Sequence, residues 1–241
     1  MPRAGLRHLL RATCRRPQAS GFGLITRQVH QEMLMFCFRL LISLSCFLLT
    51  ALSLRAQQPA NSFVVIEEDF NSPHLDAGWQ NAEEWYSSGT SLTNRFVSKA
   101  DASGKRIAHD LKDCRNSVFQ IKYKLLNQES VFSTRIRVSD ASIRDSESEV
   151  VVKVTPKSTI LGLGKSKSDE VIEILDQRKN TLPIEEWHTL RIVFWGPFIT
   201  VGNTGTLIKG QSTNVNNEKQ AVSFSGFEVR IDEVNIWAQS Q

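Results

Sequence analysis

Residues 185–205 read "EEWHTLRIVFWGPFITVGNTG", and apolar residues alternate with other residues along the first half of this stretch. The residues expected to face a core are Leu190, Ile192 and Phe194, and those expected to face outward are Arg191, Val193 and Trp195. The pattern breaks once, at Gly196-Pro197, and the stretch ends in a small turn. Period-two alternation is typical of a strand that is buried on one face only. The stretch therefore predicts a β-hairpin that contributes to a sandwich core.

Similar short runs continue along the chain, with polar turns between them. They cover 63–70, 117–127, 131–138, 149–155, 171–175, 188–195, 198–202, 221–226 and 227–237. The last run changes phase at Asp232-Glu233, which predicts a β-bulge. Many short strands without long helical stretches between them favour an all-β fold. We expect one antiparallel β-sandwich of the jelly-roll type over residues 63–238.

An uncharged apolar run, "LLISLSCFLLTALSL", covers residues 40–54, after Arg39 and shortly before Ala56. Such a run behind a positive charge and before a small residue is typical of a secretory signal. We expect a signal peptide over 35–56, cleaved after Ala56 or alternatively after Ser53. An uncleaved anchor is the other interpretation, although the run is short for a membrane span of roughly 20 residues.

The residues before this signal, 1–34, are interpreted as an upstream extension or as the result of a start site placed too early. In the second case the true start is Met33 or Met35. Residues 57–62 form a predicted linker between the signal and the folded domain. The signal predicts a secreted or periplasmic protein, which contacts the membrane only through this segment during export.

Removal of the leader changes the charge and the cysteine content of the protein. Residues 1–56 carry eight Arg and one Glu, so their removal changes the formal net charge from +4 to −3. A negative domain loses the basic character expected of a nucleic-acid-binding protein, so we expect no nucleic-acid partner. Cys114 is the one cysteine outside the leader, which excludes an intrachain disulfide after cleavage.

The hairpin also carries a resemblance to a known fold family. Trp187, the run 190–192 and the turn at 202–205 resemble a recurring hairpin of concanavalin A-like (laminin-G-like) jelly-roll domains. The opening "EEDFNSPHLDAGW" (67–79) and the closing "SGFEVRIDEVNIW" (225–237) resemble the first and last strands of the same superfamily. The nearest resemblance is to secreted bacterial domains of the 3-keto-disaccharide hydrolase-like group. It implies an extracellular glycan as the ligand.

Aromatic and basic residues are the candidate ligand contacts. Trp85, Tyr86 and Trp195 are candidates for stacking on a sugar ring, because an aromatic ring has an apolar body and a polar edge. Arg191 shares the outward side of its strand with Trp195. Trp187, by contrast, is expected to fill a place in the core.

A basic surface is the second candidate site. The outward positions of 117–127 and 131–138 carry Lys122, Lys124, Arg135 and Arg137, which would gather in one patch if the two strands pair as a hairpin. Like charges that lie opposite each other need partners. These partners are either neighbouring acids or an anionic ligand, such as a uronic or sulfated glycan.

The sequence favours binding over catalysis. Laminarinase-type hydrolases of this fold carry E-x-D-x-x-E, and here Glu67, Asp69 and Ser72 fail at the last position. The leading hypothesis is a secreted carbohydrate-binding domain without a cofactor. The alternatives are a glycan-processing enzyme, which would be a hydrolase of glycosidic bonds, and a laminin-G-type protein-interaction domain.

Calcium is the one metal considered, held by Asp69 and Asp232 if the first and last strands meet, or by loop acids around 140–147.

Overall fold

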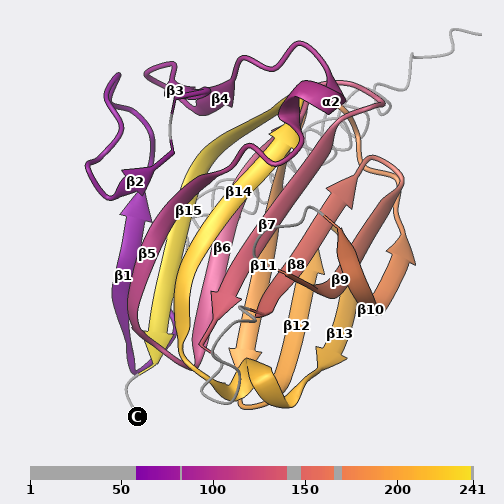
Figure 1. The fold of residues 1–241 in the computed structure, drawn as a ribbon. Coiled ribbons are helices and arrows are strands. Elements are labelled where there is room, and N and C mark those ends of the chain that lie inside the picture. The colour runs from indigo at the N-terminus through magenta and orange to yellow at the C-terminus, as the bar shows by residue number, and fades with distance from the viewer. Residues whose placement is uncertain (1–57, 82, 140–147, 166–169, 240–241) are drawn as a thin grey trace, which may run out of the picture. The chain divides into compact units, whose positions relative to one another are not determined.

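The computed structural model describes residues 58–239 except for 82, 140–147 and 166–169. Nearly all of its regular structure is antiparallel β-sheet, and two sheets pack face to face (Figure 1). The predicted all-β sandwich is therefore confirmed. The upstream extension (1–34), the signal segment (35–56) and the loop acids at 140–147 lie outside the described residues. Within the described ranges, no helix is both long and apolar enough to cross a membrane.

Sheet A lies behind sheet B in the view of Figure 1 and follows the order β13-β12-β11-β6-β15-β4-β3, with β1 also paired to β15. Its strands are β1 (Ser62–Glu68), β3 (Trp85–Ser87), β4 (Leu92–Asn94), β6 (Ser117–Leu125), β11 (Trp187–Trp195), β12 (Phe198–Asn203), β13 (Thr206–Gln211) and β15 (Val229–Gln239). The hairpin of the opening stretch is β11–β12, and its Leu190, Ile192 and Phe194 are buried as predicted.

Sheet B follows the order β10-β9-β8-β7-β14-β5-β2. Its strands are β2 (Trp79–Gln80), β5 (Ile107–Cys114), β7 (Val131–Val138), β8 (Ser148–Thr155), β9 (Ser158–Lys165), β10 (Val171–Lys179) and β14 (Lys219–Phe227). A short helix, α2 (Lys99–Ala102), precedes β5, and a 3-10 turn, η1 (Thr213–Asn216), precedes β14. Ser98 caps α2 by accepting a hydrogen bond from the Asp101 amide.

The core lies between the sheets, and a series of side-chain hydrogen bonds crosses it. Tyr123 of β6 is buried and stacks on Phe132 of β7, with ring centroids 4.9 Å apart. Its hydroxyl donates to Asn203 Oδ1 of β12 at 2.7 Å, and Asn203 Nδ2 donates to Thr159 Oγ1 of β9 at 2.9 Å. Buried polar groups are costly without hydrogen-bond partners. These hydrogen bonds therefore fix the position of sheet A relative to sheet B.

Three features of the strand topology bear directly on the sequence predictions. The register of β15 against β6 shifts between Ile231 and Glu233, which confirms the bulge predicted at Asp232-Glu233. The first and last strands pair, because β1 runs beside β15. The hairpin assumed for 117–127 and 131–138 does not form, because β6 belongs to sheet A and β7 to sheet B.

Candidate functional site

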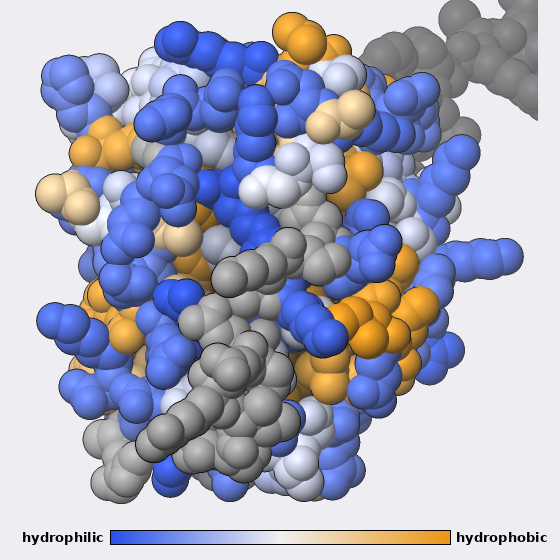
Figure 2. All heavy atoms as spheres, in the orientation of Figure 1, coloured by the Kyte–Doolittle hydropathy of each residue, from blue (hydrophilic) through white to orange (hydrophobic). Residues whose placement is uncertain are grey.

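The outer face of sheet B, turned away from the core, carries the larger of two neighbouring pockets. Hydrophilic residues cover much of this face of the domain in Figure 2. The larger pocket encloses about 500 Å³. Its lining comes from the segment before β3, from the α2–β5 turn and from β5, β7, β8 and β14, and consists of Asn81, Glu83, Glu84, Trp85, Gly104, Lys105, Arg106, Ala108, Arg137, Glu149, Ala221 and Ser223.

Small side chains form the floor of this pocket. Ala108 of β5 pairs with Ser223 of β14, and Ala221 lies two residues before Ser223 on the same face. Side chains two apart on a strand point the same way, so these residues all face outward from the core. Large residues at these positions would fill the space that the pocket occupies. The open volume therefore follows from small residues at the outward positions of two adjacent strands.

A buried ion-pair cluster forms one side of the pocket. Arg135 of β7 and Glu149 of β8 are only 2% and 4% exposed, although both point away from the core. Arg135 Nη1 lies 2.9 Å from Glu149 Oε2, and Arg106 Nη1 reaches both carboxylate oxygens at 3.2 and 3.1 Å. Burial raises the pKa of Glu149 above its ordinary value, while the charges and hydrogen bonds of both guanidinium groups oppose the rise.

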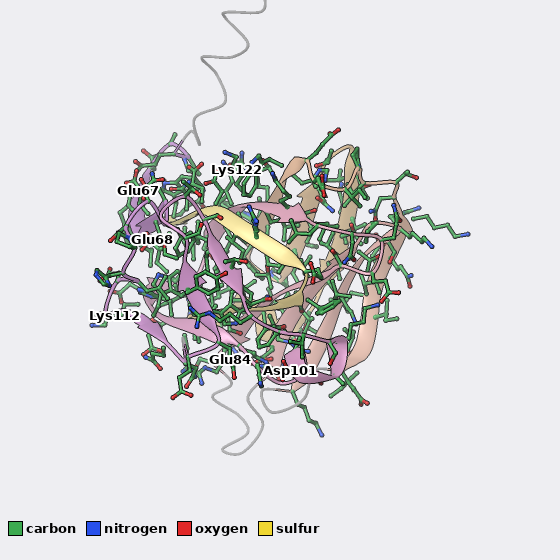
Figure 3. All side chains as sticks on the ribbon, turned by 90° about the horizontal axis from the view of Figure 1, so that it is seen from above. Glu67, Glu68, Glu84, Asp101, Lys112 and Lys122 are labelled. Carbon is green, nitrogen blue, oxygen red and sulfur yellow. The ribbon has the colours of Figure 1, made fainter. Side chains whose placement is uncertain are left out.

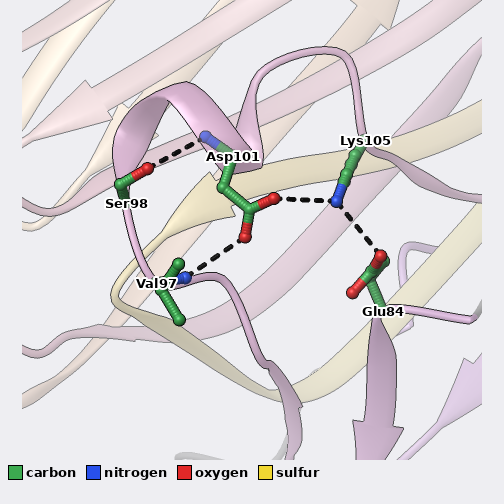
Figure 4. A network of polar contacts seen from close by, with 5 residues as sticks. All are labelled: Glu84, Val97, Ser98, Asp101 and Lys105. Carbon is green, nitrogen blue, oxygen red and sulfur yellow. Dashed lines mark hydrogen bonds and ion pairs between the residues drawn. The ribbon is translucent and has the colours of Figure 1, made fainter.

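A second network holds the rim of the pocket (Figure 4). Lys105 Nζ lies 3.1 Å from Glu84 Oε1 and 2.9 Å from Asp101 Oδ1, so it joins the segment before β3 to α2. Asp101 also accepts a hydrogen bond from the Val97 amide. The hydrogen bond from Lys105 lowers the pKa of Asp101, and the hydrogen bond to Asp101 raises the pKa of Lys105. These contacts fix the position of one wall of the pocket.

The predicted aromatic pair separates into two environments. Trp85 lines the larger pocket but is only 3% exposed, with its ring edge-on to Phe96. Its indole nitrogen has no hydrogen-bond partner within the described part of the chain. Tyr86, the next residue, is exposed and lies under the Arg95 guanidinium at 4.5 Å. Trp85 therefore does not offer an open stacking surface.

The predicted basic patch is split between the two outer faces of the sandwich. Lys122 and Lys124 belong to sheet A, whereas Arg135 and Arg137 belong to sheet B. Figure 3 shows Lys122 on the opposite side of the domain from Glu84 and Asp101. A single patch of all four residues is therefore wrong, because it depended on a hairpin that the topology does not contain.

Each of these four basic residues lies close to an acidic or an aromatic side chain. Lys122 Nζ lies 2.5 Å from Asp232 Oδ2, and Lys124 Nζ lies 4.5 Å from the centre of the Trp187 ring. Arg137 Nη2 lies 3.8 Å from Asp110 Oδ1 at the pocket rim. Neighbouring acids thus serve as partners for Lys122 and Arg137, which was the first of the two alternatives for this set.

The outer face of sheet A holds the remaining predicted contacts. Trp195 is 59% exposed at the end of β11, beside the exposed Phe198, and Arg191 is exposed on the same face. Trp187 is also partly exposed here, so the expectation that it fills the core is wrong. The structure therefore does not bring Trp195 or Arg191 together with Trp85.

The proposed calcium ligands make contacts of other kinds. Asp69 accepts hydrogen bonds from the backbone and side-chain nitrogens of Asn71 at 3.0 and 2.7 Å, which lowers its pKa. Asp232 pairs with Lys122. Among the residues that the structure describes, no three His, Cys, Asp or Glu side chains gather in a way that could hold a metal ion.

Sequence reasoning did not identify Arg106, Glu149 or the small residues of the floor as parts of a site. One signal was present in the sequence. The run 219–227, "KQAVSFSGF", places Ala221, Ser223 and Ser225 at alternate positions between apolar residues. Small residues on one side of a strand indicate that another group approaches closely or that space is left open. Segments that are distant in the sequence bury Glu149, so no local sequence pattern predicts its burial.

The sequence matches no protein-family model and no curated protein. Solved structures with similar folds include a non-specific endo-β-1,3(4)-glucanase of family GH16 (SCLam), with a TM-score of 0.55 and 14% identity over 77% of this chain and 94% of that one. The catalytic domain of an endo-1,3-β-glucanase (laminarinase) from Thermotoga petrophila has a TM-score of 0.55 and 9% identity over 75% and 99% of the two chains. The Bacillus licheniformis β-glucanase has a TM-score of 0.51 and 9% identity over 76% and 100%. The chain thus has the concanavalin A-like jelly-roll fold.

Proposed function

We propose that this protein binds a carbohydrate in the larger pocket on the outer face of sheet B. The observation that carries the proposal is the composition of the lining, which combines amide, hydroxyl, carboxylate, ammonium and guanidinium groups. A sugar presents hydroxyl groups that both donate and accept hydrogen bonds, so a lining of mixed donors and acceptors suits it. The solved structures of similar fold include enzymes that act on β-glucans, which supports a saccharide as the class of ligand.

The charges of the larger pocket favour a neutral ligand. Arg106 is paired with Glu149, Lys105 with Glu84 and Asp101, and Arg137 with Asp110. A ligand in this pocket therefore meets cations that already have carboxylate partners. Hydrogen bonds to charged groups are the stronger ones, so the paired side chains still provide well-oriented donors and acceptors for neutral hydroxyls.

Binding without hydrolysis is the function we favour for this pocket. A retaining glycosidase needs two carboxyl groups about 5 Å apart, one of which acts as a nucleophile. Glu149 is the buried carboxylate here, and both of its oxygens are held by guanidinium groups. Hydrolysis of a 3-keto-glycoside is the second candidate, because Glu149 is a buried carboxyl group in the lining and burial raises its pKa.

Secretion to the periplasm or the exterior, directed by the signal predicted at 35–56, is part of this proposal. A protein that binds glycans outside the cell must leave the cytoplasm. Detection of a mature N-terminus near residue 57 in the secreted fraction would support it, and an intact N-terminus in the cytoplasm would contradict it.

A glycan array, followed by calorimetric titration of the glycans that bind, tests the proposal. Ala108→Leu places a larger side chain on the pocket floor and is expected to lower affinity at least about tenfold. The matched control is Thr200→Leu, which adds similar bulk to the outer face of sheet A. Equal affinities for both variants, or a blank array, would contradict the proposed site. Release of product from a 3-keto-disaccharide would instead favour the enzyme.

A further inference from the structure

A smaller pocket of about 190 Å³ lies on the same outer face of sheet B, beside the larger one. Ser225 of β14, Ser133 of β7 and Lys153 of β8 line it and form one row, because Ser225 pairs with Ser133 and Ser133 pairs with Lys153. Arg135, two residues from Ser133 on the same face, lines this pocket as well. Since Arg135 also contacts Glu149 of the larger pocket, the two pockets share a boundary.

The charge of the smaller pocket differs from that of its neighbour. Three of the residues that line it are basic, namely Lys99, Arg135 and Lys153, and none of the lining residues is acidic. Lys99 pairs at an exposed position with Glu129 at 3.5 Å, and Arg135 pairs with Glu149. Lys153 makes no ion pair or side-chain hydrogen bond with the described part of the chain. Lys153 is half-buried and therefore lines the pocket without a carboxylate partner there.

Two hydroxyl groups add donors beside this ammonium. Ser133 and Ser225 are 7% and 8% exposed, and neither side chain hydrogen-bonds to a described residue. Each hydroxyl can donate one hydrogen bond, and the lysine ammonium can donate three. A small pocket bordered by a lysine and two hydroxyls suits an oxyanion, because charge-assisted hydrogen bonds to such a group are strong.

We propose that the smaller pocket binds an oxyanion, the sulfate or carboxylate substituent of the saccharide whose neutral part lies in the larger pocket. This inference rests on the proposed function for the choice of a saccharide, while the oxyanion site itself rests on the lining of the smaller pocket. Lys153, Ser133 and Ser225 contact the oxyanion directly. Arg135 lines the smaller pocket and pairs with Glu149 of the larger one, and so keeps the substituent next to the sugar ring.

Amide NMR titration at constant ionic strength tests the site with inorganic sulfate, glucose, glucuronate and glucose 6-sulfate as probes. Sulfate and at least one acidic sugar are expected to shift the amides around Ser133, Lys153 and Ser225, and glucose is expected to leave these amides unchanged. Lys153→Gln should weaken the binding of the acidic probes about tenfold, since one charge-assisted contact is lost. Lys209→Gln, on β13 of sheet A, removes the same charge elsewhere and should have no effect.

The outcomes separate this inference from the proposed function. Shifts that spread over both sheets and that do not respond to Lys153→Gln would overturn the oxyanion site, and so would the absence of shifts at these amides. Neutral glycans that bind and are blocked by Ala108→Leu would leave the proposed function standing in that case. Sulfate bound at Lys153 without any glycan bound in the larger pocket would support the oxyanion site and contradict the saccharide. A preference between glucuronate and glucose 6-sulfate identifies the substituent.

Discussion

The outer faces of the two sheets differ in how far their outward side chains are exposed to solvent. On β11 and β12 of sheet A, Trp195 and Phe198 point away from the core and are exposed. On β7 and β8 of sheet B, Arg135 and Glu149 also point away from the core and are buried. The difference arises because Arg106 from the α2–β5 turn packs over Glu149 and shields it from solvent. Alternation along a strand fixes direction, whereas segments distant in the sequence decide exposure.

Removal of one partner from the buried cluster should have the largest effect on stability. Arg135→Met leaves part of the Glu149 charge without compensation in a buried place, which should lower the free energy of unfolding by about 3 kcal/mol. Lys122→Met breaks the more exposed pair with Asp232 on sheet A and should cost about 1 kcal/mol or less. Chemical denaturation of both variants provides the measurement. Similar losses would contradict the contrast between the faces.

Glycine substitutions should show the same contrast on a smaller scale. A Cβ at Gly164 of β9 would lie 2.9 Å from Val151 Cγ2 and 3.1 Å from Arg135 Nη1, so Gly164→Ala should cost about 1–3 kcal/mol through overpacking. A Cβ at Gly202 of β12, on the outer face of sheet A, meets nothing within 4 Å. Gly202→Ala should be neutral or stabilise by up to about 1 kcal/mol. Thermal unfolding of both proteins tests the pair, and a neutral Gly164→Ala would show that the cover over sheet B is loose.

The pH dependence of stability should identify Glu149 as a buried acid. Burial raises its pKa in the folded state, so the folded protein holds this proton at a higher pH than the unfolded chain does. Its contribution to stability is full below the ordinary pKa of 4.5 and is lost as the pH rises through the folded value. The stability of wild type relative to Glu149→Gln should therefore decline as the pH rises from about 4. A relative stability that increases over this range would contradict the assigned direction.

Truncation of the most exposed aromatic residue should have the smallest effect. Trp195→Ala removes a ring that is largely in solvent, so the expected loss of stability is below about 1 kcal/mol. Glycan affinity should also stay unchanged, because the ring lies on the outer face of sheet A. A loss of affinity with this variant, measured by calorimetry, would move the binding site to sheet A.

The sequence allowed most of the strands and their inward faces to be predicted. Buried positions such as Ile121 and Ile192 alternate with outward ones, and the bulge at Asp232-Glu233 was visible as a change of phase. Strands β5, β9 and β13 and the short strands β2, β3 and β4 escaped prediction; in β9, Gly162 and Gly164 interrupt the alternation of side chains. Alternation also cannot tell which sheet a strand joins, so β6 and β7 were wrongly considered as a hairpin.

The candidate site was less predictable because it depends on contacts between distant segments. Trp85 was identified as an aromatic residue, but its burial and its free indole N–H depend on the fold. The pairing of Arg106 with Glu149 joins residues 43 positions apart. The lining of the smaller pocket brings together residues from α2, β7, β8 and β14. No one of these segments shows by itself that the lining residues include no carboxylate.

Hydrogen exchange with and without a glycan that binds in the array tests the central claim most directly. Bound glycan is expected to slow amide exchange in β5, β7, β8 and β14 and in the α2–β5 turn, because these segments line the two pockets. Exchange in β11, β12 and β13 should remain unchanged. Protection confined to β11–β13, around Trp195, would contradict the assignment of the binding site to the outer face of sheet B.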